Sequence, residues 1–120
     1  MDINSALIAL SALSQETRLQ LFRLLIPYGR EGVPAGVISE KLGIPHNTLS
    51  FHLTHLKHAG LVVAQRRGRS IIYAANCDVT EELIAFLVEN CCTEEKGAVT
   101  RKPLCVPVKG KARRSKEVCC

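Results

Sequence analysis

The six cysteines are the residues of this 120-residue sequence best able to bind a soft ligand. Two adjacent pairs occur, at positions 91–92 and 119–120, and the others are Cys77 and Cys105. In a reducing compartment thiols serve more often as metal ligands, redox sensors or buried small residues than as disulfides. We therefore expect Cys77 to be a small buried residue, and the pair Cys91–Cys92 to bind a ligand.

Basic and imidazole side chains form the second group with possible chemistry. Arg66, Arg67 and Arg69 crowd around Gly68 with no acid nearby, which makes a local basic point. Four histidines lie within 13 residues, at spacings that could hold zinc on a helix: His46, His52, His55 and His58. We interpret His46 as a DNA contact and the other three as packing residues.

Composition limits the classes of protein to which the chain can belong. Hydrophobic residues at 47% and charged residues at 22% are ordinary for one soluble domain, and no apolar run is long enough to cross a membrane. The N-terminus lacks a secretory signal pattern, so we expect a cytoplasmic protein. Residues 1–92 carry equal numbers of acids and bases, and the net charge of +5 lies in residues 93–120. We predict a folded domain over 1–92 and a flexible, basic, cysteine-containing tail over 93–120.

Hydrophobic periodicity predicts a mainly helical domain with one β-hairpin. Apolar residues at helical spacing, including Ile3, Leu7 and Leu10 at the start, and capping or stop signals predict five helices over 2–12, 15–26, 35–42, 45–59 and 78–92. We expect Ser14 to cap the second helix and Asp78 to cap the last. Two β-prone runs, 61–64 and 71–74, flank the arginines and predict a hairpin with a basic tip.

A short helix, a turn, a second helix and a hairpin form the arrangement of a winged helix-turn-helix, whose second helix enters the major groove. Opposite the apolar stripe of that helix lie side chains able to reach bases and phosphates, and the arginines of the hairpin add phosphate or minor-groove contacts. The predicted DNA-binding residues are His46, Asn47, Thr48, Ser50, Thr54, Lys57, Arg66, Arg67 and Arg69. A winged helix used only for protein contacts is the alternative outside gene regulation.

The sequence resembles the ArsR/SmtB family of metal-responsive repressors. The resemblance lies in the second predicted helix (Leu13, Ser14, Thr17, Arg18 and Leu19), in the stretch TLSFHLTHLKHAGLV over 48–62, and in the wing from Arg67 to Tyr73. It implies a homodimer, formed by the first and last helices, that binds double-stranded operator DNA without a cofactor and lets go when a metal or metalloid binds. The uncovered apolar faces of those two helices independently favour a dimer, with half-sites roughly 34 to 36 Å apart.

Departures from the family pattern limit which inducers the protein could bind. Residues 33–38 contain no cysteine and residues 78–92 contain no histidine, so two sites used by other family members are missing. Cys91 and Cys92 remain, and by resemblance to arsenite-responsive members they would bind trivalent arsenic, with antimony also possible. We expect Cys105 to be the third ligand, with Cys119 or Cys120 as alternatives. A repressor selective for methylated arsenicals through two thiolates and a redox-switched repressor also stay open.

An enzyme is not expected. A phosphatase-like arsenate reductase needs arginine six residues after its cysteine, and none of the six cysteines has one. The sequence has neither a glycine-rich nucleotide loop nor a recognisable catalytic Ser, His and Asp set.

Overall fold

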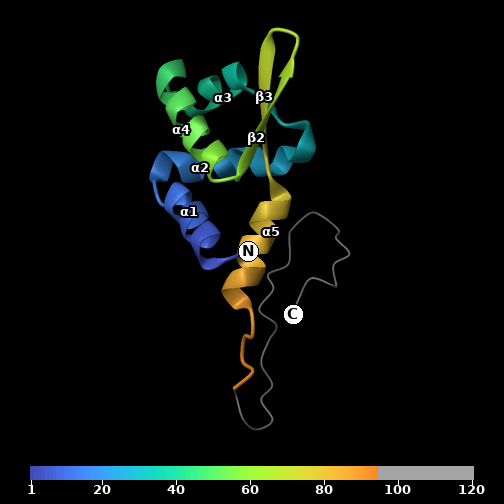
Figure 1. Ribbon diagram of the computed structural model, residues 1–120. Coiled ribbons are helices and arrows are strands. Elements are labelled where there is room, and N and C mark those ends of the chain that lie inside the picture. The colour runs from blue at the N-terminus through green and yellow to red at the C-terminus, as the bar shows by residue number, and fades with distance from the viewer. Residues whose placement is uncertain (95–120) are drawn as a thin grey trace. The chain divides into compact units, whose positions relative to one another are not determined.

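The computed structural model describes residues 1–94 and divides after Glu89 into two units, which are considered separately. The first unit comprises α1 (Ile3–Leu13), α2 (Glu16–Leu25), the 3-10 helix η1 (Ile26–Glu31), β1 (Val33–Pro34), α3 (Ala35–Leu42), α4 (His46–His58), β2 (Val62–Arg67), β3 (Ser70–Ala75) and α5 (Cys77–Val88). The hairpin of β2 and β3 projects beyond the helices at one end of this unit, while α1 and α5 lie toward the other end (Figure 1). The predicted winged helix-turn-helix fold is confirmed.

The wing is a three-stranded antiparallel sheet rather than a lone hairpin. Its strand order is β1-β3-β2, and β1 pairs Val33 with Tyr73. The sequence did not predict β1. Gly32, with φ +74°, precedes it and lies so close to β3 that an added Cβ would stand 2.6 Å from the carbonyl oxygen of Tyr73. Only glycine fits both that backbone conformation and that spacing.

The core is an aliphatic layer contributed by several helices and by the start of the wing. Its largest fully buried side chains are Leu21, Leu25, Ile38, Leu49, Leu53, Leu56 and Leu61. Burial of each such side chain contributes roughly 1.5 to 3 kcal/mol relative to exposure. This layer holds α2, α3 and α4 together, and it thereby fixes the orientation of the helix-turn-helix.

Helix α1 buries a face of small side chains and leaves its larger apolar residues uncovered. Its buried residues are Ala6, Ala9 and Ala12, at i, i+3 and i+6. Ile3 and Leu7 are 60% and 56% exposed. Small side chains allow α1 to approach the core closely, so its larger apolar side chains remain on the outer surface of this chain.

Helix α2 and its N-cap each begin one residue later than predicted. Gln15, rather than Ser14, is the N-cap, and its Oε1 accepts a hydrogen bond from the backbone N–H of Arg18 at 2.9 Å. Leu19 and Ile26, apolar residues in the predicted helix 15–26, are 43% and 39% exposed.

Helix α5 differs from its prediction at both ends. Asn76, rather than Asp78, is the N-cap, and its Oδ1 accepts a hydrogen bond from the backbone N–H of Val79. The helix ends at Val88, before the cysteine pair that the sequence placed in its last turn. Leu83 is buried, whereas three other apolar side chains of the helix are exposed: Ile84, Leu87 and Val88. Cys77 is also exposed, so the expectation that it is a buried small residue was wrong.

Within residues 1–94, the structure contains no helix with the length and apolar character that a membrane span requires.

Candidate nucleic-acid interface and thiol pair

Ser39 fixes the turn between α3 and α4. The backbone N–H of Gly43, which has φ +67°, donates to the carbonyl oxygen of Ser39 at 2.8 Å, and the Ser39 hydroxyl donates to the carbonyl oxygen of Ile44 at 2.6 Å. The left-handed conformation at Gly43 ends α3 as predicted. Pro45 then forms the extended N-cap of α4. The turn thus sets α4 at a defined angle to α3.

The far end of α4 closes with a Schellman motif. Gly60 has φ +80°, and its N–H donates to the carbonyl oxygen of Lys57 while the N–H of Leu61 donates to that of Leu56. Leu61 is fully buried. The motif therefore anchors the end of α4 in the core and directs the chain into β2.

All six predicted DNA-binding residues of α4 are exposed: His46, Asn47, Thr48, Ser50, Thr54 and Lys57. The opposite face of the helix is buried through Leu49, Leu53 and Leu56. The Oδ1 atom of Asn47 accepts a hydrogen bond from the backbone N–H of Thr48 at 3.0 Å, so Asn47 must rotate to present both amide atoms to an adenine. An exposed polar face on a helix anchored from behind can contact base edges and phosphates.

The three arginines surround the wing tip. Arg66 and Arg67 are the last residues of β2, opposite Ile71 and Ser70 of β3, and Arg69 lies in the turn beside Gly68, which has φ +62°. All three side chains are exposed. Because side chains alternate along a strand, Arg66 and Arg67 lie on opposite faces of the wing. The tip therefore presents positive charge in more than one direction.

A buried polar contact joins α2 to α4. The Nε of Arg18 donates to the carbonyl oxygen of Ala12 at 2.7 Å, and Arg18 Nη1 lies 3.4 Å from Nδ1 of His52. Arg18 and His52 are only 9% and 8% exposed. Burial lowers the pKa of His52 from 6.5, and the nearby charges of Arg18 and His55 lower it further. A neutral His52 can accept from Arg18, so this contact stabilises α4 in its position against α2.

Cys91 and Cys92 lie in the second unit, and their sulfur atoms are 2.9 Å apart. Both side chains are exposed. Cys92 has φ +66°, so the pair belongs to an irregular turn and not to a helix. Two thiols at this separation on an open turn can bind one thiophilic atom together. Cys105, Cys119 and Cys120 lie outside the described residues.

Within residues 1–94, no group of three or more His, Cys, Asp or Glu side chains is arranged to hold a metal ion. The alternative of a zinc site among the four histidines of α4 therefore has no support in this part of the chain. The packing interpretation allowed core or surface positions: His52 is buried, and His55 and His58 are exposed.

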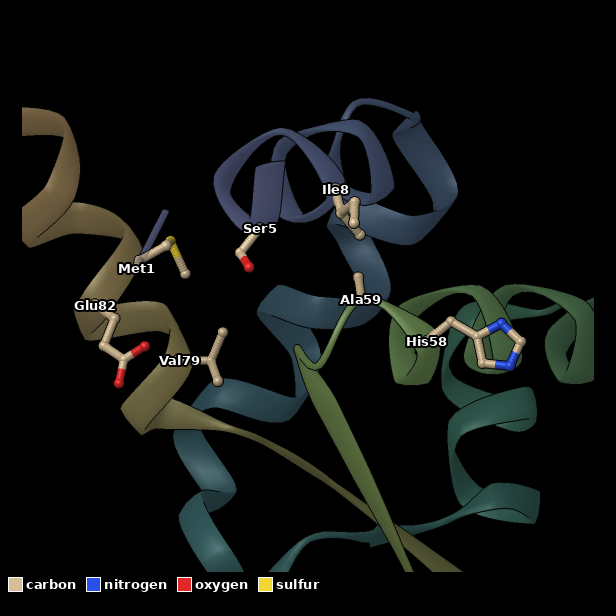
Figure 2. A pocket seen from close by; sticks show the side chains of 7 residues that line it. All are labelled: Met1, Ser5, Ile8, His58, Ala59, Val79 and Glu82. Atoms are coloured by element: carbon tan, nitrogen blue, oxygen red, sulfur yellow. The ribbon is translucent and has the colours of Figure 1, made fainter. Parts of the chain in front are cut away.

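A shallow hollow of about 240 Å³ lies where α1, the end of α4 and α5 meet. Its lining is mixed in polarity and contains no thiol: Met1, Ser5, Ile8, His58, Ala59, Val79 and Glu82. His58 turns its imidazole ring away from Met1, Ser5 and Val79 (Figure 2). The hollow adjoins the exposed apolar residues of α1 and has no convergent set of polar groups that would mark a catalytic site.

Sequence reasoning missed two features of this region. The contact between Arg18 and His52 joins residues 34 positions apart and has no local signal, although each residue belongs to a segment that the resemblance singled out. Phe51 lies on the outer face of α4 and is 64% exposed. Its spacing of four residues from Asn47 and three from Thr54 could have placed it on that face.

The chain is similar to known helix-turn-helix proteins. A family model described as a helix-turn-helix domain matches residues 13–65. An ArsR-like transcriptional regulator from Rhodococcus sp. RHA1 superposes with a TM-score of 0.64 at 27% identity, over 76% of this chain and 82% of that one.

Two further solved structures are similar over most of their length. The transcriptional repressor BigR from Xylella fastidiosa is 30% identical, covering 79% of this chain and 91% of that chain, with a TM-score of 0.55. The homodimeric winged helix-turn-helix DNA-binding domain of Mb0332 from Mycobacterium bovis, a possible ArsR-family regulator, is 26% identical over 82% of this chain and 90% of that one, with a TM-score of 0.60. These relatives are transcriptional regulators and not enzymes, in agreement with the sequence analysis.

Proposed function

The chain belongs to the family of ArsR-like winged helix-turn-helix transcriptional regulators, and we propose that it is a homodimeric repressor released from operator DNA by trivalent arsenic. In this proposal DNA binding needs no cofactor, and arsenite is the inducer, with antimonite as a second ligand of the same chemistry. The protein would act in the cytoplasm, where operator DNA is accessible in a bacterial cell.

DNA binding is supported by α4 and the wing acting together. Asn47, Ser50 and Thr54 supply donors and acceptors for base edges, and Lys57 supplies a charge for phosphate. Arg66, Arg67 and Arg69 supply planar guanidinium groups for phosphates or for a narrow minor groove.

Dimer formation is supported by the apolar residues that α1 and α5 leave on the surface. Leu7 of α1 and Ile84 and Leu87 of α5 are each more than half exposed, and the two helices contact one another. A second copy would cover this surface, as the homodimeric state of the Mycobacterium bovis relative suggests. A twofold axis would bring two copies of α4 to successive major grooves.

The observation that carries the choice of inducer is the 2.9 Å separation of the Cys91 and Cys92 sulfur atoms in an exposed turn. Thiolates prefer soft acceptors, and trivalent arsenic takes three sulfur ligands or, when methylated, two. Cys105 is the proposed third ligand of the inorganic ion, and Cys119 and Cys120 are the alternatives.

Release follows from the place of the pair in the sequence. Cys91 is three residues beyond Val88, the last residue of α5, and α5 carries part of the proposed dimer surface. Arsenic bound at the pair would change the backbone at the end of α5 and favour a dimer with the wrong spacing between the two α4 helices. A coupling of about 1 to 3 kcal/mol would lower operator affinity roughly 5- to 150-fold.

The test is a fluorescence anisotropy titration of the reduced full-length protein on its upstream promoter DNA. We expect arsenite to release the wild type at near-stoichiometric amounts, zinc to have no effect, and the variant Cys91→Ser/Cys92→Ser to bind DNA normally without release. Cys77→Ser, which removes another exposed thiol, is the matched control and should behave as the wild type.

The other outcomes separate the alternatives. Release by methylarsenite alone would assign a two-thiolate site, and release by oxidant that reductant reverses would assign a redox switch. A double variant still released by arsenite would contradict the assignment of this pair. Failure of the wild type to bind any DNA would favour a protein-interaction module.

A further inference from the structure

Phe51 is an apolar ring on the polar face of α4. At 64% exposed it exceeds every other large hydrophobic side chain in residues 1–94, including those of the proposed dimer surface. It does not belong to the core cluster or to the residues packed against it. A ring this exposed removes little apolar area from water on folding, so core packing does not account for phenylalanine here.

The ring is nevertheless oriented by its neighbours. Its centroid lies 5.4 Å from that of His52, with the planes inclined at 66°, and 6.3 Å from that of His55. His52 is itself held in the core beside Arg18. The edge-on contact with a buried imidazole therefore restrains Phe51, which lowers the entropy cost of its binding a partner.

The position of Phe51 is central among the residues expected to meet DNA. Asn47 precedes it by four residues and Thr54 follows by three, so the three side chains lie along one line of the helix. The buried side chains of Leu49, Leu53 and Leu56 occupy the other face. A helix that inserts this line into the major groove brings Phe51 to the base edges, between the positions of Asn47 and Thr54.

The major groove offers phenylalanine one apolar partner. Among the base edges exposed there, hydrogen-bonding groups dominate, and only thymine carries a methyl group, at C5. Asn47 and Thr54 can recognise donors and acceptors, whereas Phe51 can form no hydrogen bond. We propose that Phe51 is a specificity-determining residue that contacts the 5-methyl group of a thymine in each operator half-site. This proposal rests on the proposed function, because it requires that α4 bind DNA.

The experiment removes one methyl group from the DNA and one ring from the protein. A high-affinity duplex is first selected from a random pool with the reduced full-length protein, and each thymine of its half-sites is then replaced in turn by deoxyuridine. At one symmetric pair of thymines we expect the affinity of the wild type to fall about three- to fivefold per half-site. This loss corresponds to the free energy of burying one methyl group. Phe51→Ala should bind thymine and deoxyuridine duplexes with a ratio near one.

Two further variants control for general effects. Phe51→Leu, which keeps an apolar side chain, should retain part of the discrimination. Tyr28→Ala removes another exposed aromatic ring, outside α4, and should retain all of it. Circular dichroism of Phe51→Ala should match the wild type because the ring is outside the core.

The results distinguish this proposal from the proposed function. If the wild type selects a duplex but no thymine position discriminates, or if Phe51→Ala still discriminates, the methyl contact is overturned and the DNA-binding regulator stands. If the wild type selects no duplex, both fail, and the exposed ring is better explained as an anchor for a protein partner.

Discussion

Helices α4, α1 and α5 are all amphipathic, but α4 exposes mainly polar side chains whereas α1 and α5 expose large apolar ones. Helix α4 buries leucines at 49, 53 and 56 and shows a mostly polar face to the outside. Helix α1 buries three alanines, α5 buries Leu83, and both leave larger apolar side chains exposed. The sequence pattern predicted an apolar face in each case, but not which part of it the chain would cover by itself.

The difference indicates two kinds of partner. A polar face with one restrained aromatic ring suits the groove of a nucleic acid, in which hydrogen bonds dominate. An aliphatic face suits a second protein surface, because its burial releases water from apolar area. In the proposed function the molecule is therefore divided into a DNA-facing end at α4 and the wing, and a self-associating end at α1 and α5.

The largest effect should come from breaking the self-associating end. Leu87→Asp places a charge on an apolar surface, so we expect a monomer and an operator affinity at least about 100-fold lower, because simultaneous binding of two half-sites is lost. Leu87 is 57% exposed in the single chain, so the helix content of the variant should equal that of the wild type. Sedimentation velocity and anisotropy measure the two consequences.

The control for this variant is Ala85→Asp, which adds the same charge to α5 on the side that carries Asp78 and Glu81. It should remain dimeric and bind DNA as the wild type does. A Leu87→Asp protein that stays dimeric would remove the proposed role of α5.

A smaller effect should come from the wing. Arg69→Gln removes one charge from each protomer at the exposed turn, so we expect affinity to fall roughly five- to tenfold at moderate salt, for cognate and unrelated DNA alike. The slope of log affinity against log salt should decrease by about 1 per protomer. Glu31→Gln, which removes a charge from η1, is the control. An unchanged slope for Arg69→Gln would show that Arg69 does not contact a DNA phosphate.

The smallest effect should appear in the pH dependence of stability. The pKa of His52 is lowered in the folded state by burial and by Arg18 and His55. Above pH 6.5 the imidazole is neutral in both states, and as the pH falls below 6.5 the unfolded chain binds a proton that the folded chain resists. The free energy of unfolding should therefore fall between pH 7 and the lowered pKa of His52.

Urea unfolding at several pH values measures this dependence. His52→Gln, whose amide oxygen can still accept from Arg18, should show a weaker decline on acidification. His46→Gln, at an exposed position of the same helix, keeps His52 and should retain the wild-type decline. Equal declines in all three proteins would show that protonation of His52 does not oppose folding.

Local signals in the sequence predicted most of the fold. Gly43 ends α3, Gly60 ends α4 and the β-prone runs on either side of Gly68 form the hairpin, because each depends on residues close in sequence. The exposure of the nine predicted DNA-binding residues was predictable for the same reason, since helical spacing opposite a leucine stripe and a turn between strands both place side chains outside.

The missed features depend on contacts between distant segments. A two-residue strand such as β1 has no periodicity and exists because β3 lies beside it. The alanine face of α1 is buried because the core accepts a close approach there. Hydrophobicity alone instead marked the apolar face of this helix by its larger residues Ile3 and Leu7. The contact of Arg18 with His52 requires α2 and α4 to be packed already.

Gly32 has a consequence for how this domain can vary under mutation. Its missing side chain lets β1 lie against β3, and β1 leads directly into α3, so the glycine sets the distance between the wing and the first helix of the helix-turn-helix. Any substitution there would meet the Tyr73 carbonyl, whereas Gly29 has open space around it. A substitution at position 32 would therefore shift the wing relative to α3, so that a mutation outside the proposed DNA-binding residues could still change the spacing between them.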